Sequence, residues 1–207
     1  TSAGDVTVGG ISVKVVPKVI YLGAQLCIDG DQSGELQRRI RAGVFAFYKY
    51  RSFFCNRIVP MSLKRKLYHS AVQPAFTYAS ETWGVRKNTL SSIAVAQRRL
   101  ERAMLGITIL DRRTNEWVRL RTQLKDLVLQ CDLRKWCWVK RISGLSDFRW
   151  AKKVIVWNPR EDWKRGVGRP RIRWTDDFKK TVGTEFLQLA RAATLSDWKE
   201  HIMELRV

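Results

Sequence analysis

The spacing of the apolar residues changes at Gly34, and this change constrains the fold more than any other feature of the sequence. Before it, Val6-Thr7-Val8 and Ile11-Ser12-Val13-Lys14-Val15 alternate apolar and polar residues around Gly9-Gly10, which predicts a β-hairpin. Residues 19–22 predict another short strand that ends at Gly23. After it, apolar residues recur at the spacing of one helical face, and these residues are Leu36, Ile40, Val44, Phe47 and Phe54.

Capping residues and prolines divide the next part of the chain. Ser62 is suited to begin a second helix, and Pro74 is expected to kink or end it. A third helix is predicted over about residues 89–105, with Gly106 at its C-terminal end. These signals predict several packed helices rather than a sheet.

Two further helices follow. Thr114 or Asn115 opens the fourth, which carries Trp117 and Leu120 as its apolar residues. The fifth covers roughly residues 124–142, with Leu129, Leu133, Trp136 and Val139 on one face.

Glycine and proline interrupt residues 143–174, which are predicted to be mostly loop. Thr175 then caps a short helix with Asp176 and Asp177 in its first turn, where carboxylates suit the helix dipole. A last helix would carry Leu195, Trp198, Ile202 and Leu205. The predicted class is therefore mainly α: a short N-terminal β segment (residues 1–30), a helical bundle (31–142) and a loop-rich basic C-terminal segment (143–207).

The charge of the chain points to an anionic partner. Lys and Arg number 39 against 19 Asp and Glu, a formal net charge of +20, and such self-repulsion destabilises a compact chain unless an anion is bound. Nucleic acid is the commonest partner of this kind. No apolar run approaches the roughly 20 residues of a membrane span, so no membrane association is expected.

The positive charge is concentrated. Between Leu36 and Ser80 there are nine Lys or Arg and no Asp or Glu, with Tyr48 and other aromatic residues interleaved. Basic groups with rings between them suit phosphate contacts and base stacking. The candidate nucleic-acid-binding residues are Arg38, Arg39, Arg41, Tyr48, Lys49, Arg51, Lys64, Arg65 and Lys66. The alternative is a basic surface that only keeps the protein in solution.

The four cysteines and two histidines do not have zinc-ligand spacing, since no Cys-x-x-Cys occurs. Cys27, Cys55, Cys131 and Cys137 are therefore expected to be buried free thiols of an intracellular protein. No metal site and no bound cofactor are predicted for this chain.

Residues 164–173 form an arginine-rich segment with a Gly168-Arg169-Pro170-Arg171 core that resembles an AT-hook. Such a segment can lie in a narrow minor groove, whose negative potential attracts guanidinium groups. The candidate residues are Arg165, Arg169, Arg171 and Arg173. A basic linker that contacts phosphates at most is the alternative.

Several motifs occur in an order that resembles the C-terminal part of reverse transcriptases of non-LTR (LINE, RTE-like) retrotransposons. They are Tyr21-Leu22-Gly23, Tyr78-Ala79-Ser80-Glu81-Thr82-Trp83, Leu105-Gly106-Ile107-Thr108, Asp111-Arg112-Arg113-Thr114-Asn115-Glu116, Trp157-Asn158-Pro159-Arg160, and the run from Gly168 to Asp177. Each motif alone is weak, but their number and order span nearly the whole chain.

The resemblance implies that Tyr21, Leu22 and Gly23 belong to the primer grip and that residues 31–142 form the thumb, whose basic face holds a template–primer duplex of RNA–DNA hybrid, RNA or DNA. The parent enzyme uses Mg²⁺ held by aspartates. Those aspartates would precede residue 1, so the chain alone is expected to be inactive and to need the palm and fingers of the same polyprotein. Asp176-Asp177 is interpreted as a helix start and not as their substitute.

The implied setting is a nuclear or cytoplasmic ribonucleoprotein. Two other hypotheses stay open from the sequence. One is a stand-alone basic DNA-binding protein of AT-hook type, and the other is a degenerate retrotransposon remnant without function.

Overall fold

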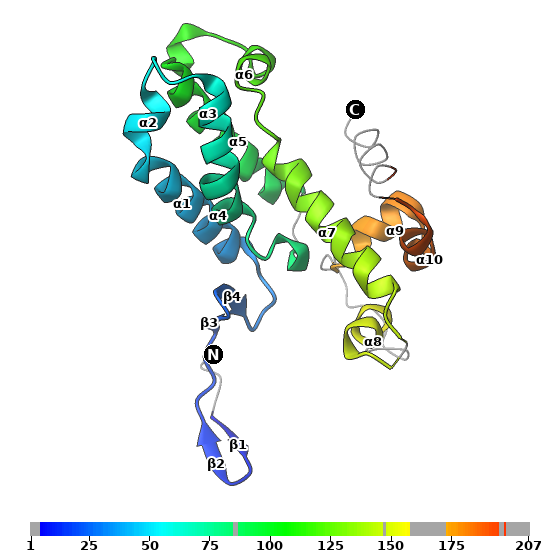
Figure 1. Ribbon diagram of the computed structural model, residues 1–207. Coiled ribbons are helices and arrows are strands. Elements are labelled where there is room, and N and C mark those ends of the chain that lie inside the picture. The colour runs from blue at the N-terminus through cyan, green and yellow to red at the C-terminus, as the bar shows by residue number, and fades with distance from the viewer. Residues whose placement is uncertain (1–4, 85–86, 147, 158–172, 195–196, 198–207) are drawn as a thin grey trace.

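The computed structural model describes residues 5–84, 87–146, 148–157, 173–194 and 197. Two small β-hairpins at the N-terminal end project from a bundle of helices, and one long helix, α7, joins this bundle to a second group of helices (Figure 1). The predicted class, mainly α after a short N-terminal β segment, is confirmed.

Both hairpins are antiparallel and two-stranded. β1 (Val6–Val8) pairs with β2 (Ile11–Val13) across the predicted Gly9-Gly10 turn. β3 (Lys18–Tyr21) pairs with β4 (Ala24–Cys27), and this second hairpin was not predicted. The apolar side chains of β1 and β2 are all largely exposed.

The first hydrophobic core is built by α1 (Ser33–Lys49), α2 (Arg51–Cys55), α3 (Met61–Leu67), the π-helical turn η1 (Tyr68–Val72), α4 (Gln73–Thr77), α5 (Lys87–Leu105) and the start of α7. Leu36, Phe47 and Phe54 are buried in it as the periodicity predicts. The helix predicted from Gly34 is interrupted at Tyr50, so Phe54 reaches the core from α2.

The structure differs from the prediction in two details of this region. Ser62 does not cap α3, which begins one residue earlier after Pro60 and has no side-chain cap. Pro74 was predicted to kink or end this helix; it does not end it, because the π-helical turn η1 leads directly from α3 into α4, whose first turn contains Pro74.

The end of the bundle follows the predicted caps. Gly106 has φ +67° after α5, and the Thr114 hydroxyl accepts a hydrogen bond from Trp117 N at 3.1 Å where α6 (Asn115–Thr122) begins. The predicted apolar face of α6 is wrong, since Leu120 is 70% exposed and Val118 is buried instead. Only one apolar residue of this short helix therefore reaches the core.

α7 (Leu127–Ser143) begins where the Asp126 carboxylate accepts hydrogen bonds from Val128 N and Leu129 N. Its second half forms another core with α9 (Asp176–Val182) and α10 (Phe186–Ala192), centred on Trp136, Phe178 and Phe186. The described part of the C-terminal segment thus packs on α7.

Residues 143–174, which were predicted to be mostly loop, include one helix among their described residues, α8 (Trp150–Val156). Asp176 and Asp177 do lie in the first turn of α9, but its start is fixed by Asp176, whose carboxylate accepts from Arg173 N at 2.8 Å, and not by the Thr175 side chain. The predicted last helix lies outside the described residues, apart from Asp197.

Candidate nucleic-acid interface

The Tyr21-Leu22-Gly23 segment forms the end of β3 and the turn to β4. Leu22 has φ +46° and Gly23 has φ +77°, the two positive values of a type I′ hairpin turn, and Tyr21 pairs with Ala24. The side chains of Tyr21 and Leu22 are 62% and 78% exposed. The turn therefore presents its side chains outward and its carbonyl groups toward the helices.

Side chains from two helical segments hold these carbonyls. The Tyr78 hydroxyl, just after α4, donates to Leu22 O at 2.8 Å. Arg38 and Arg39 of α1 both donate to Gly23 O. A Cβ on Gly23 would lie 3.3 Å from the Tyr78 oxygen, so this close approach, together with the positive φ, requires glycine.

Glu35 orients the two arginines. Its buried carboxylate accepts from Arg39 Nε at 2.6 Å, from Arg38 Nε at 2.8 Å and from Gln25 N of β4 at 2.7 Å. Burial alone would raise the pKa of Glu35, but the hydrogen bonds from Arg38, Arg39 and Gln25 outweigh it and hold the pKa below its ordinary value. We call Glu35, Arg38, Arg39 and Tyr78 the turn anchor.

Arg39 is the centre of the turn anchor. It is 8% exposed, and its guanidinium lies 4.5 Å from the centroid of the Tyr78 ring. The Arg38 side chain is 31% exposed. Two arginines predicted to contact nucleic acid thus hold the hairpin, and Arg39 has little surface left to offer a ligand.

Farther along α1 the basic residues face solvent. Arg41, Phe45, Tyr48 and Lys49 share the side of α1 opposite the buried Phe47 and are exposed. Arg51 of α2 is also exposed, and its guanidinium lies 5.7 Å from the centroid of the Tyr48 ring. We call Arg41, Phe45, Tyr48, Lys49 and Arg51 the basic face.

The three predicted residues on α3 lie in different environments. Lys64 is buried, and its Nζ donates to Met104 O at 3.2 Å near the end of α5, where a cation suits the helix C-terminus. Burial lowers the pKa of Lys64. Arg65 donates to the Gln123 side chain, and Lys66 is exposed. Lys66 alone of the three is placed to meet a ligand without rearrangement.

The arginine-rich segment is described only at its end. Arg173 is exposed. Arg165, Arg169 and Arg171 lie outside the described residues.

Sequence reasoning missed the role of Tyr78 and the pairing of Glu35. Glu35 is the last acid before the acid-free stretch, and this isolation is the one signal that could have marked it as a partner for the arginines after it. Tyr78 contacts Leu22, which is 56 positions away, and the residues next to Tyr78 in the sequence do not indicate this contact.

The cysteines and acids do not form a metal centre among the described residues, where no group of three or more His, Cys, Asp or Glu is close enough to hold an ion. None of the four cysteines, all of which lie in the described ranges, forms a disulfide, but Cys55 and Cys137 are exposed, so the prediction that the cysteines are buried is wrong for these two. No helix in the described ranges has both the length and the apolar character to cross a membrane.

Comparison with known proteins gives one informative similarity. The chain is 32% identical over 173 residues to a transposon-derived protein of Caenorhabditis elegans. The match covers 82% of this chain and 61% of the relative, so the chain spans about three fifths of the relative's length. No protein-family model matches the chain. No solved structure matches it either. The similarity supports a transposon origin for the chain.

Proposed function

We propose that the chain is the primer-grip and thumb part of a non-LTR retrotransposon reverse transcriptase, and that its basic face holds the template–primer duplex. The observation that carries this proposal is the position of the Leu22-Gly23 turn on α1. The turn is fixed to Arg38 and Arg39, which lie three and two residues before Arg41, where the basic face begins.

The electrostatics favour binding by charge rather than by sequence. The cations of the basic face lie close together in the chain, and these are Arg41, Lys49 and Arg51. None of them forms an ion pair with an acid among the described residues. Phosphate contacts of this kind position a duplex without reading its bases, which a polymerase requires. Tyr48 and Phe45 add exposed rings between the cations.

Polymerisation itself would use Mg²⁺ held by carboxylates elsewhere in the polyprotein. The acids described here do not fit that role, because Asp177 pairs with Lys135 Nζ at 2.7 Å and Asp176 accepts from Arg173 N. The exposed apolar side chains of β1 and β2 suit packing against the palm of the same polyprotein. The role proposed for this chain is therefore to bind and position the duplex, with a nuclear or cytoplasmic ribonucleoprotein as its setting.

Fluorescence anisotropy with a labelled RNA–DNA hybrid tests the proposal. Replacing Arg41, Lys49 and Arg51 together by Ala is expected to weaken binding about tenfold or more at 0.1 M salt. The matched control replaces Lys179, Lys180 and Arg191, which are exposed on α9 and α10, and removes the same charge. Equal affinity of the two triple variants would contradict a specific role for the basic face and favour an idle basic surface.

A further inference from the structure

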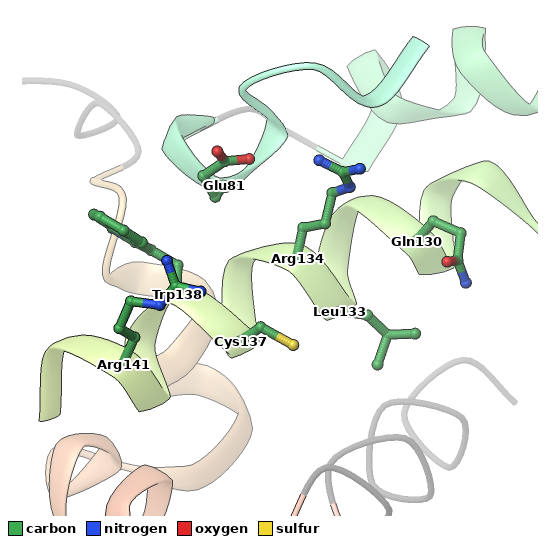
Figure 2. Close-up of a pocket in the computed structure, with 7 residues that line it drawn as sticks. All are labelled: Glu81, Gln130, Leu133, Arg134, Cys137, Trp138 and Arg141. Atoms are coloured by element: carbon green, nitrogen blue, oxygen red, sulfur yellow. The ribbon is translucent and has the colours of Figure 1, made fainter. Parts of the chain in front are cut away.

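An open groove of about 450 Å³ runs along α7 where this helix passes η2 (Ser80–Thr82). Figure 2 shows Glu81 of η2 opposite the part of α7 that carries Arg134 and Trp138. No residue of the basic face or of the turn anchor lines the groove. It is therefore a separate surface from the one proposed to hold the duplex.

The α7 side of the groove combines cations with an aromatic ring. Arg134, Trp138 and Arg141 lie four and three residues apart and share one face of the helix. The seven residue steps from Arg134 to Arg141 correspond to about 10.5 Å along the helix axis, so the two arginines can reach different phosphates of one strand. Among the described residues, neither arginine has an ion-pair partner.

The η2 side supplies an acceptor. Glu81 Oε2 is buried and has no hydrogen-bond partner among the described residues. The backbone of Glu81 is held in place, since its carbonyl accepts from Trp174 Nε1 at 2.7 Å. A buried acceptor without a donor is costly, so turning the Glu81 side chain to meet a ligand N–H group in the groove would relieve this cost.

These groups together fit a nucleotide. Guanidinium groups bind phosphates, an indole ring stacks on a base, and a carboxylate accepts from an exocyclic amino group. A paired base stacked in a duplex offers neither its face to Trp138 nor its pairing edge to Glu81.

We propose that the groove between α7 and η2 binds an unpaired stretch of nucleic acid, with a base that carries an exocyclic amino group stacked on Trp138 and hydrogen-bonded to Glu81. This site goes beyond the duplex-binding function and does not depend on it. Arg134 and Arg141 contact the phosphates on either side of the stacked base.

The thiol of Cys137 provides the direct test, because it is exposed and lines the same groove. In a Cys55→Ser background, Cys137 is the exposed cysteine that a maleimide labels. Saturating oligo(dC) is expected to slow labelling of Cys137 severalfold, whereas a blunt RNA–DNA hybrid leaves it unchanged. Undiminished labelling under saturating oligo(dC) would overturn the proposal. Slow labelling of Cys137 in the absence of nucleic acid would also overturn the proposal, since it would mean that the groove is already covered.

Measurements of oligo(dC) affinity test which side chains of the groove bind the base. Trp138→Ala is expected to weaken oligo(dC) binding about 5- to 150-fold, the equivalent of about 1–3 kcal/mol of stacking, and Trp138→Phe to restore most of it. Wild-type chain is expected to prefer oligo(dC) to oligo(dT), which lacks the amino group, and Glu81→Gln to reduce this preference. Unaltered binding by Trp138→Ala would contradict the proposal.

Two controls separate this site from others. Arg191→Ala, an exposed charge removed from α10, is expected to leave oligo(dC) affinity within twofold. In the variant with Arg41, Lys49 and Arg51 replaced by Ala, oligo(dC) is still expected to protect Cys137 from labelling, whereas binding of the RNA–DNA hybrid is expected to be weakened. If this variant loses both hybrid binding and the protection of Cys137 by oligo(dC), one surface binds both ligands and the proposal of a separate site is contradicted.

Discussion

The two halves of α1 use the same kind of side chain for different purposes. In the first half, Arg38 and Arg39 are directed inward and bind Glu35 and the carbonyl of Gly23. In the second half, Arg41 and Lys49 are exposed, with Tyr48 beside them. A run of basic residues that looks uniform in the sequence is thus divided into a structural part and a part available to a ligand.

Glu35 causes this division. One buried carboxylate draws the arginines three and four residues later toward itself, and beyond their reach no acid follows on α1. The first half should therefore respond to mutation with a change in stability, and the second half with a change in binding. The following changes test this contrast, from the largest expected effect on stability to the smallest.

Glu35→Ala is expected to lower the free energy of unfolding by about 3–5 kcal/mol, because it leaves Arg39 buried without its carboxylate. Urea denaturation measures this change. Glu185→Ala, which removes an exposed acid, serves as the control and is expected to shift stability by less than about 0.5 kcal/mol. A similar small loss for Glu35→Ala would refute the anchoring role.

The same carboxylate predicts a pH dependence. The folded-state pKa of Glu35 lies below its unfolded value of about 4.5, so its contribution is present above that pH and is lost as the pH falls through the folded-state pKa. Asp31 and Asp111 also have lowered pKa values, so the informative quantity is the difference between wild type and Glu35→Gln. That difference in stability should shrink below about pH 4.5; a constant difference down to pH 2 would count against the ion pairs.

Gly23→Ala is expected to cost about 1–2 kcal/mol for its positive φ, and more because the new methyl group meets the Tyr78 hydroxyl. Gly10→Ala is a matched control, since Gly10 has φ +81° and open space around it. Thermal unfolding should show a larger loss at position 23 than at position 10. Equal losses would mean that contact with Tyr78 does not constrain the turn.

Tyr78→Phe removes the hydrogen bond to Leu22 O and is expected to cost about 0.5–1.5 kcal/mol. Tyr21→Phe, an exposed ring on the neighbouring strand, should change stability little. Hydrogen exchange at the amide of Gln25, which Glu35 holds, should accelerate in Tyr78→Phe if the turn loosens. An unchanged exchange rate at the Gln25 amide would mean that Tyr78 stabilises the protein through the packing of its ring alone and not through its hydrogen bond.

Arg41→Ala is expected to change stability by less than about 0.5 kcal/mol, because the side chain is exposed and makes no ion pair among the described residues. If Arg41→Ala lowered the free energy of unfolding as much as Glu35→Ala, the proposed difference between the two halves of α1 would be contradicted.

Local signals predicted the elements but not their long-range contacts. Gly9-Gly10, Gly106 and the Thr114 cap each act within a few residues, and the structure confirms all three. Tyr78 and Leu22 are far apart in the chain, and their pairing depends on how α1, α4 and the second hairpin pack. Such contacts leave no periodic trace in a single sequence.

Burial of charge was the other feature that the sequence did not reveal. Lys64 stands between a serine-leucine pair and two further basic residues, with nothing to distinguish it from Lys66, yet it is buried beneath the end of α5. The position of the α5 C-terminus decides this, and that position is set by the packing of the first core. A list of basic residues therefore overestimates the surface that can meet a phosphate.

The salt dependence of hybrid binding tests the central proposal most directly. If Arg41, Lys49 and Arg51 each contact a phosphate, their combined replacement by Ala should flatten the slope of log K against log salt by about 2–3, at roughly 0.7–0.9 per contact, while the unfolding midpoint stays at the wild-type value. The replacement of Lys179, Lys180 and Arg191 should leave the slope unchanged. A wild-type slope in the first variant, or an equal change in both, would contradict duplex binding by the basic face.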